Sequence, residues 1–312
     1  MTNKNIVIFK KITKNYLKEV YKKRNFRRLL ATLYPIWFFR LYMKHYLTYP
    51  MAEFQKQMFG LCESDSFKFT VIMAFPESGK STIMNLSFAL WAILGKLRKK
   101  FVVIISSNRS KALAHLNSIR QELIDNDLLI NDFGPRLDDR RLQASNYIAL
   151  PGFGAKIMAT TTYKNIRCLR HGRYRPDLII CDDIEDRSKI EKPSEQTRLL
   201  QWLHQEVVRC NETARIVVLG AKMGSKSILS SLKDSIDNET ILGTSLRCPI
   251  INIKKEITWP GKFKDQKSID SLRQLIGDHN TWSYEYTMLP PIDLVAEARK
   301  RLGKYNEETQ TY

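Results

Sequence analysis

From residue 67 onward, short apolar runs alternate with longer segments in which apolar residues recur every three or four positions. Short apolar runs predict buried strands, and a spacing of three and four predicts amphipathic helices. Their alternation is typical of βαβ units around a mostly parallel sheet flanked by helices. The pattern therefore predicts an α/β fold with strands at 67–74, 101–107, 155–160, 177–182, 215–220 and 241–246, and helices at 81–96, 109–125, 195–210 and 226–236.

The first fifty residues follow a different pattern, with about a dozen Lys and Arg against a single Glu and aromatic residues between them. This composition predicts a basic, partly helical arm over 1–50, before a main domain over 51–265 and a helical segment with a charged tail over 266–312. For Trp37, Phe38 and Tyr42, docking on the main domain is slightly favoured. Contact with nucleic acid and a helix on a membrane surface are the alternatives.

Composition narrows the class of protein. A chain of 312 residues with 43% hydrophobic content can bury a large core. Its net charge of +19 favours a polyanionic partner, DNA, RNA or an anionic membrane, although a Lys-rich composition from an AT-rich genome also explains part of the excess. The apolar stretch 29–39 is too short to span a bilayer, so a soluble protein is expected. Neither a disulfide framework nor a zinc site is indicated by the scattered cysteines Cys62, Cys168, Cys181, Cys210 and Cys248, and a reducing cytosol fits best.

The strand at 67–74 runs directly into A-F-P-E-S-G-K-S-T and then into an apolar helical stretch, which is the context of a phosphate-binding loop. Gly79 permits close backbone approach, Lys80 would bridge the β and γ phosphates, and Ser81 would place its hydroxyl on Mg²⁺. The first glycine of the usual pattern is replaced by Ala74, so a plain turn with a solvated lysine is the alternative. The candidate ATP-binding residues are Ala74, Phe75, Pro76, Glu77, Ser78, Gly79, Lys80, Ser81 and Thr82.

A second element of such a site is a carboxylate at the end of a neighbouring buried strand. The run L-I-I-C-D-D ends in two. Asp182 is the predicted metal-side residue and Asp183 the predicted catalytic base, with Glu185 as its substitute. Taken alone, the acidic pair could equally well cap the following loop. Together with the phosphate loop, it favours a catalytic site. Lys80 is then also a predicted catalytic residue.

An arginine-rich segment, N-I-R-C-L-R-H-G-R-Y-R-P-D, lies just before this strand. Arg167, Arg170, Arg173 and Arg175 have three interpretations that the spacing does not separate. In the first, they are arginine fingers that act on the γ phosphate, in cis or from a neighbouring subunit. In the second, they contact DNA phosphates. In the third, they form salt bridges with the acidic residues at 182–186.

Over roughly residues 50–290 the chain resembles the large terminase subunits of tailed bacteriophages. Four segments carry the resemblance in order: Y-P-M-A-E-F-Q-K-Q, S-S-N-R-S-K-A-L-A-H-L-N-S-I-R-Q-E-L, I-R-C-L-R-H-G-R-Y-R-P-D-L-I-I-C-D-D-I-E and W-S-Y-E-Y-T-M-L-P-P. It implies an ASCE-type P-loop NTPase, with an extra strand between the Walker A and Walker B strands. It also implies ATP- and Mg²⁺-dependent translocation of double-stranded DNA in the host cytoplasm.

The same resemblance implies partners and further site residues. The partners would be a portal protein and prohead, a small terminase subunit, and other copies of the chain in a ring. Gln55 would contact the adenine, although an exposed helical glutamine is commoner, and Gly220 with Ala221 would take the place of the coupling motif.

The chain also departs from this family. Pro76 stands where the family commonly has Arg, and Ala221 stands where it has a hydroxyl or amide side chain. No segment after Pro291 matches the family's nuclease domain, so nuclease activity is not expected in this chain. Either a separate polypeptide provides it, or the gene is truncated. A helicase-like ATPase and a DNA-binding relative that no longer hydrolyses ATP are the competing hypotheses.

Overall fold

The computed structural model describes residues 22–64, 67–134, 145–186, 192–221, 227–252 and 254–276. In this part of the chain, seven strands form one sheet in the order β3-β4-β2-β5-β6-β1-β7. All neighbouring pairs are parallel except β3 and β4. The strands are β1 (Phe69–Ala74), β2 (Phe101–Ser106), β3 (Tyr147–Leu150), β4 (Ala155–Thr161), β5 (Leu178–Asp182), β6 (Arg215–Gly220) and β7 (Gly243–Cys248).

The sheet confirms the predicted α/β class and all six predicted strands. Strand β6 lies between β1, which precedes the predicted phosphate loop, and β5, which carries Asp182. The two strands are therefore not direct neighbours in the sheet. Strand β6 is the inserted strand that an ASCE-type sheet requires. Some strand bounds differ from the prediction, and β1 and β7 each begin two residues later. Strand β3 was not predicted, because Y-I-A-L is too short to give a clear apolar run.

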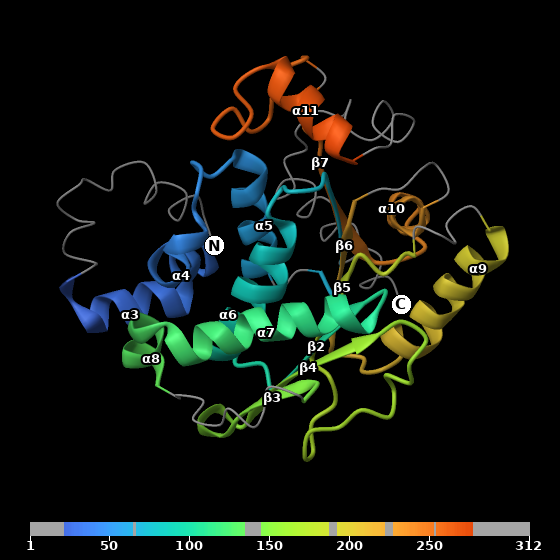
Figure 1. Cartoon of the computed structure of the whole chain (residues 1–312). Coiled ribbons are helices and arrows are strands. Elements are labelled where there is room, and N and C mark those ends of the chain that lie inside the picture. Colours follow the sequence, from blue (N-terminus) through green and yellow to red (C-terminus); the bar gives the residue numbers. More distant parts are fainter. Residues whose placement is uncertain are drawn as a thin grey trace, which may run out of the picture.

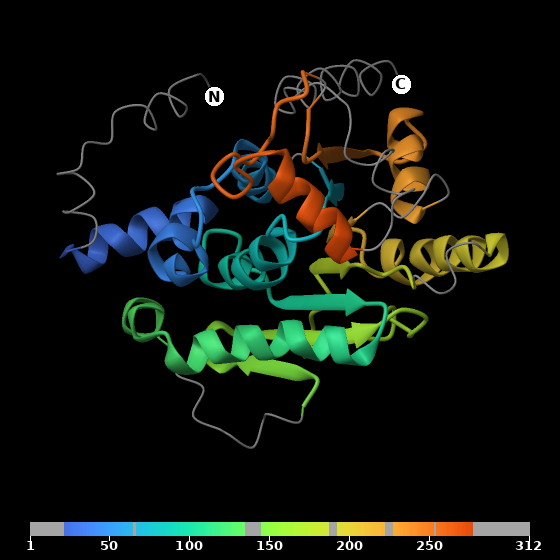
Figure 2. The same ribbon diagram turned by 45° about the horizontal axis from the view of Figure 1, so that its top comes forward.

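Helices cover both faces of the sheet (Figures 1 and 2). On one face, the side chains of α5, α6 and α7 share a buried cluster with alternate residues of the central strands. On the other face, α9 and α10 pack in a second cluster. The helices are α3 (Arg24–Leu33), α4 (Pro35–Tyr42), α5 (Glu53–Glu63), α6 (Ala89–Leu94), α7 (Arg109–Asp125), α8 (Asp127–Phe133), α9 (Pro193–Trp202), α10 (Ile228–Asp237) and α11 (Gln266–Ile276), with the short 3₁₀ segments η2 (Lys44–Tyr46) and η5 (Pro151–Phe153).

Two of the predicted helices contain π-helical segments. The helix predicted at 81–96 consists of the π-helix η3 (Thr82–Phe88) followed by α6, and the one predicted at 195–210 consists of α9 followed by the π-helix η6 (Leu203–Val208). Apolar spacing does not separate these helix types, since both place residues three to five apart on one face. The π-helix η3 lies directly after the predicted phosphate loop, and π-helical turns are frequent at functional sites.

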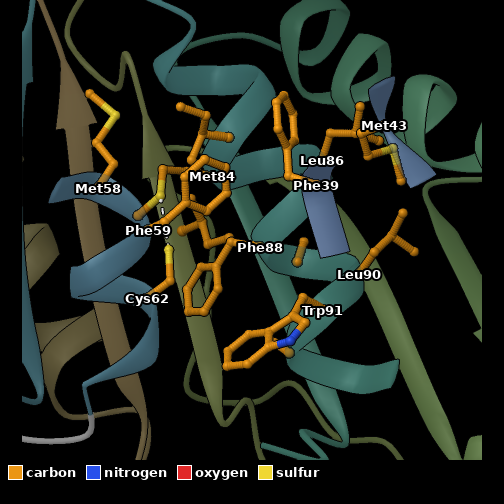
Figure 3. Close-up of a cluster of buried hydrophobic side chains, with 14 of the residues drawn as sticks. Phe39, Met43, Met58, Phe59, Cys62, Met84, Leu86, Phe88, Leu90 and Trp91 are labelled. Atoms are coloured by element: carbon orange, nitrogen blue, oxygen red, sulfur yellow. Dashed lines mark hydrogen bonds between the residues drawn. The ribbon is translucent and has the colours of Figure 1, made fainter. Parts of the chain in front are cut away.

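The segment from Arg24 to Tyr46 is packed into the main domain. Phe39 and Met43 share one buried cluster with Leu86 and Leu90 (Figure 3), and Phe38 is completely buried. The docking interpretation of its aromatic residues is therefore confirmed. Residues 1–21 of the predicted arm lie outside the described residues.

A buried ion pair ties this segment to α8. Asp132 accepts hydrogen bonds from Arg27 Nε at 2.5 Å, Arg27 Nη2 at 2.7 Å and the Tyr42 hydroxyl at 2.6 Å. A buried carboxylate with three donors is fully paired, whereas removal of one partner would leave an uncompensated charge. Arg27 thus stabilises the fold through this ion pair, and its charge is not available to a polyanionic partner.

At the other end, only α11 of the predicted helical segment 266–312 is described. The family-like segment at 282–291 and the tail lie outside the described residues. None of the helices that the structure describes has the length and apolarity needed to cross a membrane.

Candidate nucleotide-binding site

The carboxyl ends of β1, β5 and β6 meet at one edge of the sheet. Met73 of β1 pairs with Gly220 of β6, and Leu219 pairs with Asp182 of β5. In open α/β sheets, ligands bind at this edge, in the crevice beyond the strand ends. The predicted phosphate loop, acidic pair and coupling residues are therefore brought to one place.

The loop after β1 has the backbone of an anion-binding turn. Gly79 has a φ of 83°, in the region that favours glycine, and Glu77 has a φ of 62°. The helix begins at Lys80, and the amide of Ile83 donates to Gly79 O at 2.9 Å. Free amides at the start of a helix, together with the helix dipole, attract a phosphate.

Lys80, Ser81 and Asp182 lie together at the centre of this edge. Asp182 is 1% exposed. Burial and the charge of Asp183 raise the pKa of the Asp182 carboxyl, while the charge of Lys80 and a hydrogen bond from the Ser81 hydroxyl act in the opposite direction. Lys80 itself is buried. The two predicted halves of the site, 102 positions apart, are thus in electrostatic contact.

The residues present fit a magnesium–nucleotide complex. One oxygen of Asp182, Oδ1, is buried without a hydrogen-bond partner. No group of three or more His, Cys, Asp or Glu in the described residues could hold a metal ion by itself. Mg²⁺ in phosphate sites takes one or two protein ligands, with water and phosphate oxygens supplying the rest, so Asp182 and Ser81 form a suitable pair.

Asp183 contacts the predicted coupling residues. Its backbone φ of 45° is unusual for a residue other than glycine. Such strain costs of the order of 1–3 kcal/mol and is concentrated at functional sites. Asp183 Oδ1 accepts from the amide of Ala221 at 3.3 Å. The contact to this motif is made through the backbone, so it does not need the hydroxyl or amide side chain that Ala221 lacks.

Gly220 leaves room for the Asp183 carboxylate. A Cβ atom at this position would lie 2.8 Å from Asp183 Oδ1 and 3.2 Å from Leu229 Cδ1. We expect Gly220→Ala to displace Asp183 and to lower the turnover of ATP by about 10- to 100-fold, because small misplacements of reacting groups are costly. Nucleotide affinity should stay within about twofold of the wild type, since the phosphate loop is untouched.

For each variant, the steady-state rate of ATP hydrolysis and the nucleotide affinity by calorimetry are measured. Gly60→Ala is the control, because nothing lies within 4 Å of the added carbon. A Gly220→Ala variant with full turnover would show that the position of Asp183 is not set by this glycine.

Glu185 holds a helix. It is 6% exposed, and Oε1 accepts from the amide of Ile228, the first residue of α10, at 2.6 Å. Burial raises the pKa of Glu185 to about 7, and the charge of Asp183 adds to the shift. Glu185, the predicted substitute for Asp183 as catalytic base, is therefore engaged at the start of α10. Asp183 is the better placed of the two carboxylates for that task.

The raised pKa of Glu185 makes a signed prediction for stability. Between about pH 4.5 and 7 the folded chain binds more protons at this site than the unfolded chain, so this group's contribution to the free energy of unfolding falls as the pH rises. Glu185→Gln still accepts from Ile228 but does not ionise. We expect it to be more stable than the wild type at pH 8 by about 1–3 kcal/mol, and by much less at pH 5. Urea unfolding at the two pH values measures this, and an equal difference at both would contradict it.

Gln55 faces the phosphate loop. Its Nε2 donates to Ser78 O at 2.8 Å, and its Oε1 accepts from the amide of Ala52 at 2.9 Å. The residue is buried, unlike an ordinary exposed helical glutamine. A cavity of about 170 Å³ opens next to it and is lined by Tyr49, Gln55, Gly79, Thr82, Trp259 and Lys262. Gln55 is thus beside both the loop and a cavity.

Lys262, from the segment after β7, also lines this cavity. Its Nζ donates to Glu77 O at 3.1 Å and to Glu77 Oε2 at 2.8 Å, and it lies 5.3 Å from the centre of the Trp259 ring. Nothing in the sequence marks this lysine, since K-F-K-D carries no motif.

The arginine-rich segment lies elsewhere. The His171 ring is 6.2 Å from that of Phe101, the first residue of β2, and Asp177 accepts from the amides of Lys100 and Phe101. Arg170 and Arg173 thus belong to the amino edge of the strands, roughly 15 Å from the edge that carries the phosphate loop. The amides of Ile166 and Arg167 bind Glu206. The fold does not bring Arg170 or Arg173 to their own chain's loop; both are exposed, as is Arg167.

The sheet order, the loop after β1 and the carboxylate ending β5 decide the fold. It is the fold of a P-loop NTPase. The HK97 bacteriophage large terminase is similar at 13% identity and a TM-score of 0.45, over 76% of this chain and 50% of that one. A mutant of the Thermus phage P74-26 large terminase ATPase domain is similar at 14% identity and a TM-score of 0.46, over 78% and 95%. Saccharomyces cerevisiae Dbp5 bound to ADP gives 11% identity and a TM-score of 0.41, over 75% and 57%.

The chain thus spans half the length of the HK97 large terminase. No protein-family model matches it, and neither does any curated protein sequence.

Proposed function

We propose that this chain is a magnesium-dependent ATPase that drives double-stranded DNA into a viral prohead. The observation that carries the ATPase part is the apposition of Lys80, Ser81 and Asp182 at adjacent strand ends. The packaging part rests on the four ordered segments that resemble large terminases.

Each residue of the site has a distinct task in this proposal. The amides of the phosphate loop and Lys80 bind the phosphates, and Ser81 and Asp182 hold Mg²⁺. The ion, when bound, neutralises charge on the β and γ phosphates. Asp183 orients a water molecule and accepts its proton. The cavity beside Gln55 receives the adenine, and its aromatic wall at Trp259 excludes water.

The substrate of the motor is double-stranded DNA. A net charge of +19 supports a polyanionic partner, and much of this charge is accessible, including Arg167, Arg170 and Arg173. These arginines are available to DNA, or to the ATP site of a neighbouring copy in a ring. The remaining partners would be a portal protein, a small terminase subunit and a separate nuclease chain.

Phosphate release by the wild type and Lys80→Ala tests the enzyme. We expect the wild type to hydrolyse ATP and the variant to be at least about 100-fold slower, since the lysine stabilises transferring phosphate. Lys56→Ala, in a surface pair with Glu53, is the control. Equal release by the wild type and Lys80→Ala would favour a relative that binds DNA without turnover, which Pro76 and Ala221 make a real alternative.

DNA specificity is tested separately. Stimulation by portal and prohead would support packaging, whereas stimulation by single strands or forks would support a helicase-like ATPase. Binding to duplex DNA should fall with salt with a log–log slope of roughly −0.9 per phosphate neutralised. A flat salt dependence would remove DNA from the account.

A further inference from the structure

We propose that Asn85 and His115 are positioning residues that together fix one oxygen of Asp182 and keep the other turned toward the nucleotide. The inference rests on the proposed function and deepens it. His115 lies in one of the four segments that resemble large terminases, and Asn85 lies in none of them. Neither residue has a role in the mechanism above.

Asn85 provides the first contact. It lies in the π-helix η3 and is 1% exposed. Its Nδ2 donates to Asp182 Oδ2 at 2.5 Å. An amide in the middle of an apolar helix is costly to bury unless it is paired. The Nδ2 of Asn85 is paired with the carboxylate that the metal needs, whereas its Oδ1 is buried without a hydrogen-bond partner.

His115 provides the second contact, from a different element. It projects from α7, and its Nε2 lies 3.3 Å from the same oxygen, Asp182 Oδ2. Two side chains from two helices therefore converge on one carboxylate oxygen.

The opposite oxygen is left without a partner. Asp182 Oδ1 is buried and makes no hydrogen bond, and neither does the hydroxyl of Ser106, which pairs with Asp182 in the neighbouring strand. Residues in register on parallel strands point to the same face of a sheet. Unpartnered buried oxygens on one face are a place for an ordered water or ion.

The choice of an amide has a physical reason. The terminal torsion of an aspartate is broad, so an unrestrained carboxylate presents either oxygen. A neutral donor fixes the plane of the carboxylate without cancelling its charge, whereas a lysine at this position would compete with the cation. Groups of this kind orient metal ligands, and their loss typically lowers metal affinity by about 10- to 100-fold.

The test is calorimetric binding of ADP at a series of Mg²⁺ concentrations and in EDTA. Asn85→Leu keeps the volume and removes the donor. We expect the Mg²⁺ concentration for half-maximal tightening of ADP binding to rise by about tenfold or more. ADP affinity in EDTA should stay at the wild-type value, because the phosphate loop is intact.

Ser87→Ala removes a different buried polar group, a hydroxyl, from the same helix and should behave as the wild type. An unchanged Mg²⁺ dependence in Asn85→Leu would overturn the proposal, as would an equal loss of affinity in Mg²⁺ and in EDTA, which indicates a merely structural role. If Asn85→Leu does not fold, His115→Ala, at a partly exposed position, undergoes the same test with the same criteria. Wild-type protein that binds no ADP in Mg²⁺ would instead reject the proposed function, and this inference with it.

Discussion

Replacing Asp183 by Asn is expected to lower the rate of ATP hydrolysis by about 10²- to 10⁴-fold, while nucleotide affinity stays close to that of the wild type. The amide has the same shape, so it still accepts from the Ala221 backbone, but it does not take a proton from water. A loss confined to the catalytic rate indicates a contact made only in the transition state.

Single-turnover hydrolysis and calorimetric ADP affinity measure the two quantities. Asp186→Asn, an exposed carboxylate three positions on, is the matched control and should retain its rate. If Asp183→Asn hydrolyses ATP as fast as the control, another group activates the water, and Asp183 serves only to link β5 to β6.

Phe38→Ala is expected to destabilise the whole domain by about 3–5 kcal/mol, as for other large aromatic residues in a core. Phe38 is 0% exposed and packs against the rings of Tyr42 at 5.3 Å and Phe133 at 5.8 Å. Since its cluster is continuous with the one beneath the sheet, the loss should appear in the global transition.

Urea unfolding followed by tryptophan fluorescence and by circular dichroism tests this. Leu29→Ala, on the same segment but 54% exposed, should change the free energy of unfolding by less than about 0.5 kcal/mol. An early separate transition in Phe38→Ala, with the main transition unmoved, would mean that α3 and α4 unfold as an independent arm.

The centre of the sheet was predictable because β1, β2, β5 and β6 are buried on both faces. Such strands are continuous apolar runs, as in F-V-V-I-I-S of β2 and L-I-I-C-D of β5, and the polar residue that ends each run marks the functional edge. The phosphate loop was predictable for a related reason, because a strand, a Gly-Lys-Ser and an apolar helix are contiguous in sequence.

Contacts between distant segments were not predictable in this way. No local pattern states that Glu185 binds the start of α10, that Asn85 and His115 meet at Asp182, or that Lys262 reaches Glu77. The arginine-rich segment illustrates the same limit. Arg170 and Arg173 are close to Asp182 in sequence, which suggested that they lie close to ATP. However, the segment precedes β5 and Asp182 ends it, so the two arginines lie at the opposite edge of the sheet.

The proposed function requires that Lys80 and Asp182 form one site for a magnesium nucleotide. Calorimetric titration with ATP, in Mg²⁺ and in EDTA, is the experiment that decides this, on the wild type, Lys80→Ala and Asp182→Asn. We predict one saturable site in the wild type that is tighter in Mg²⁺, loss of binding in Lys80→Ala, and loss of the Mg²⁺ effect alone in Asp182→Asn. Absence of ATP binding in the wild type, or wild-type binding by both variants, would contradict it.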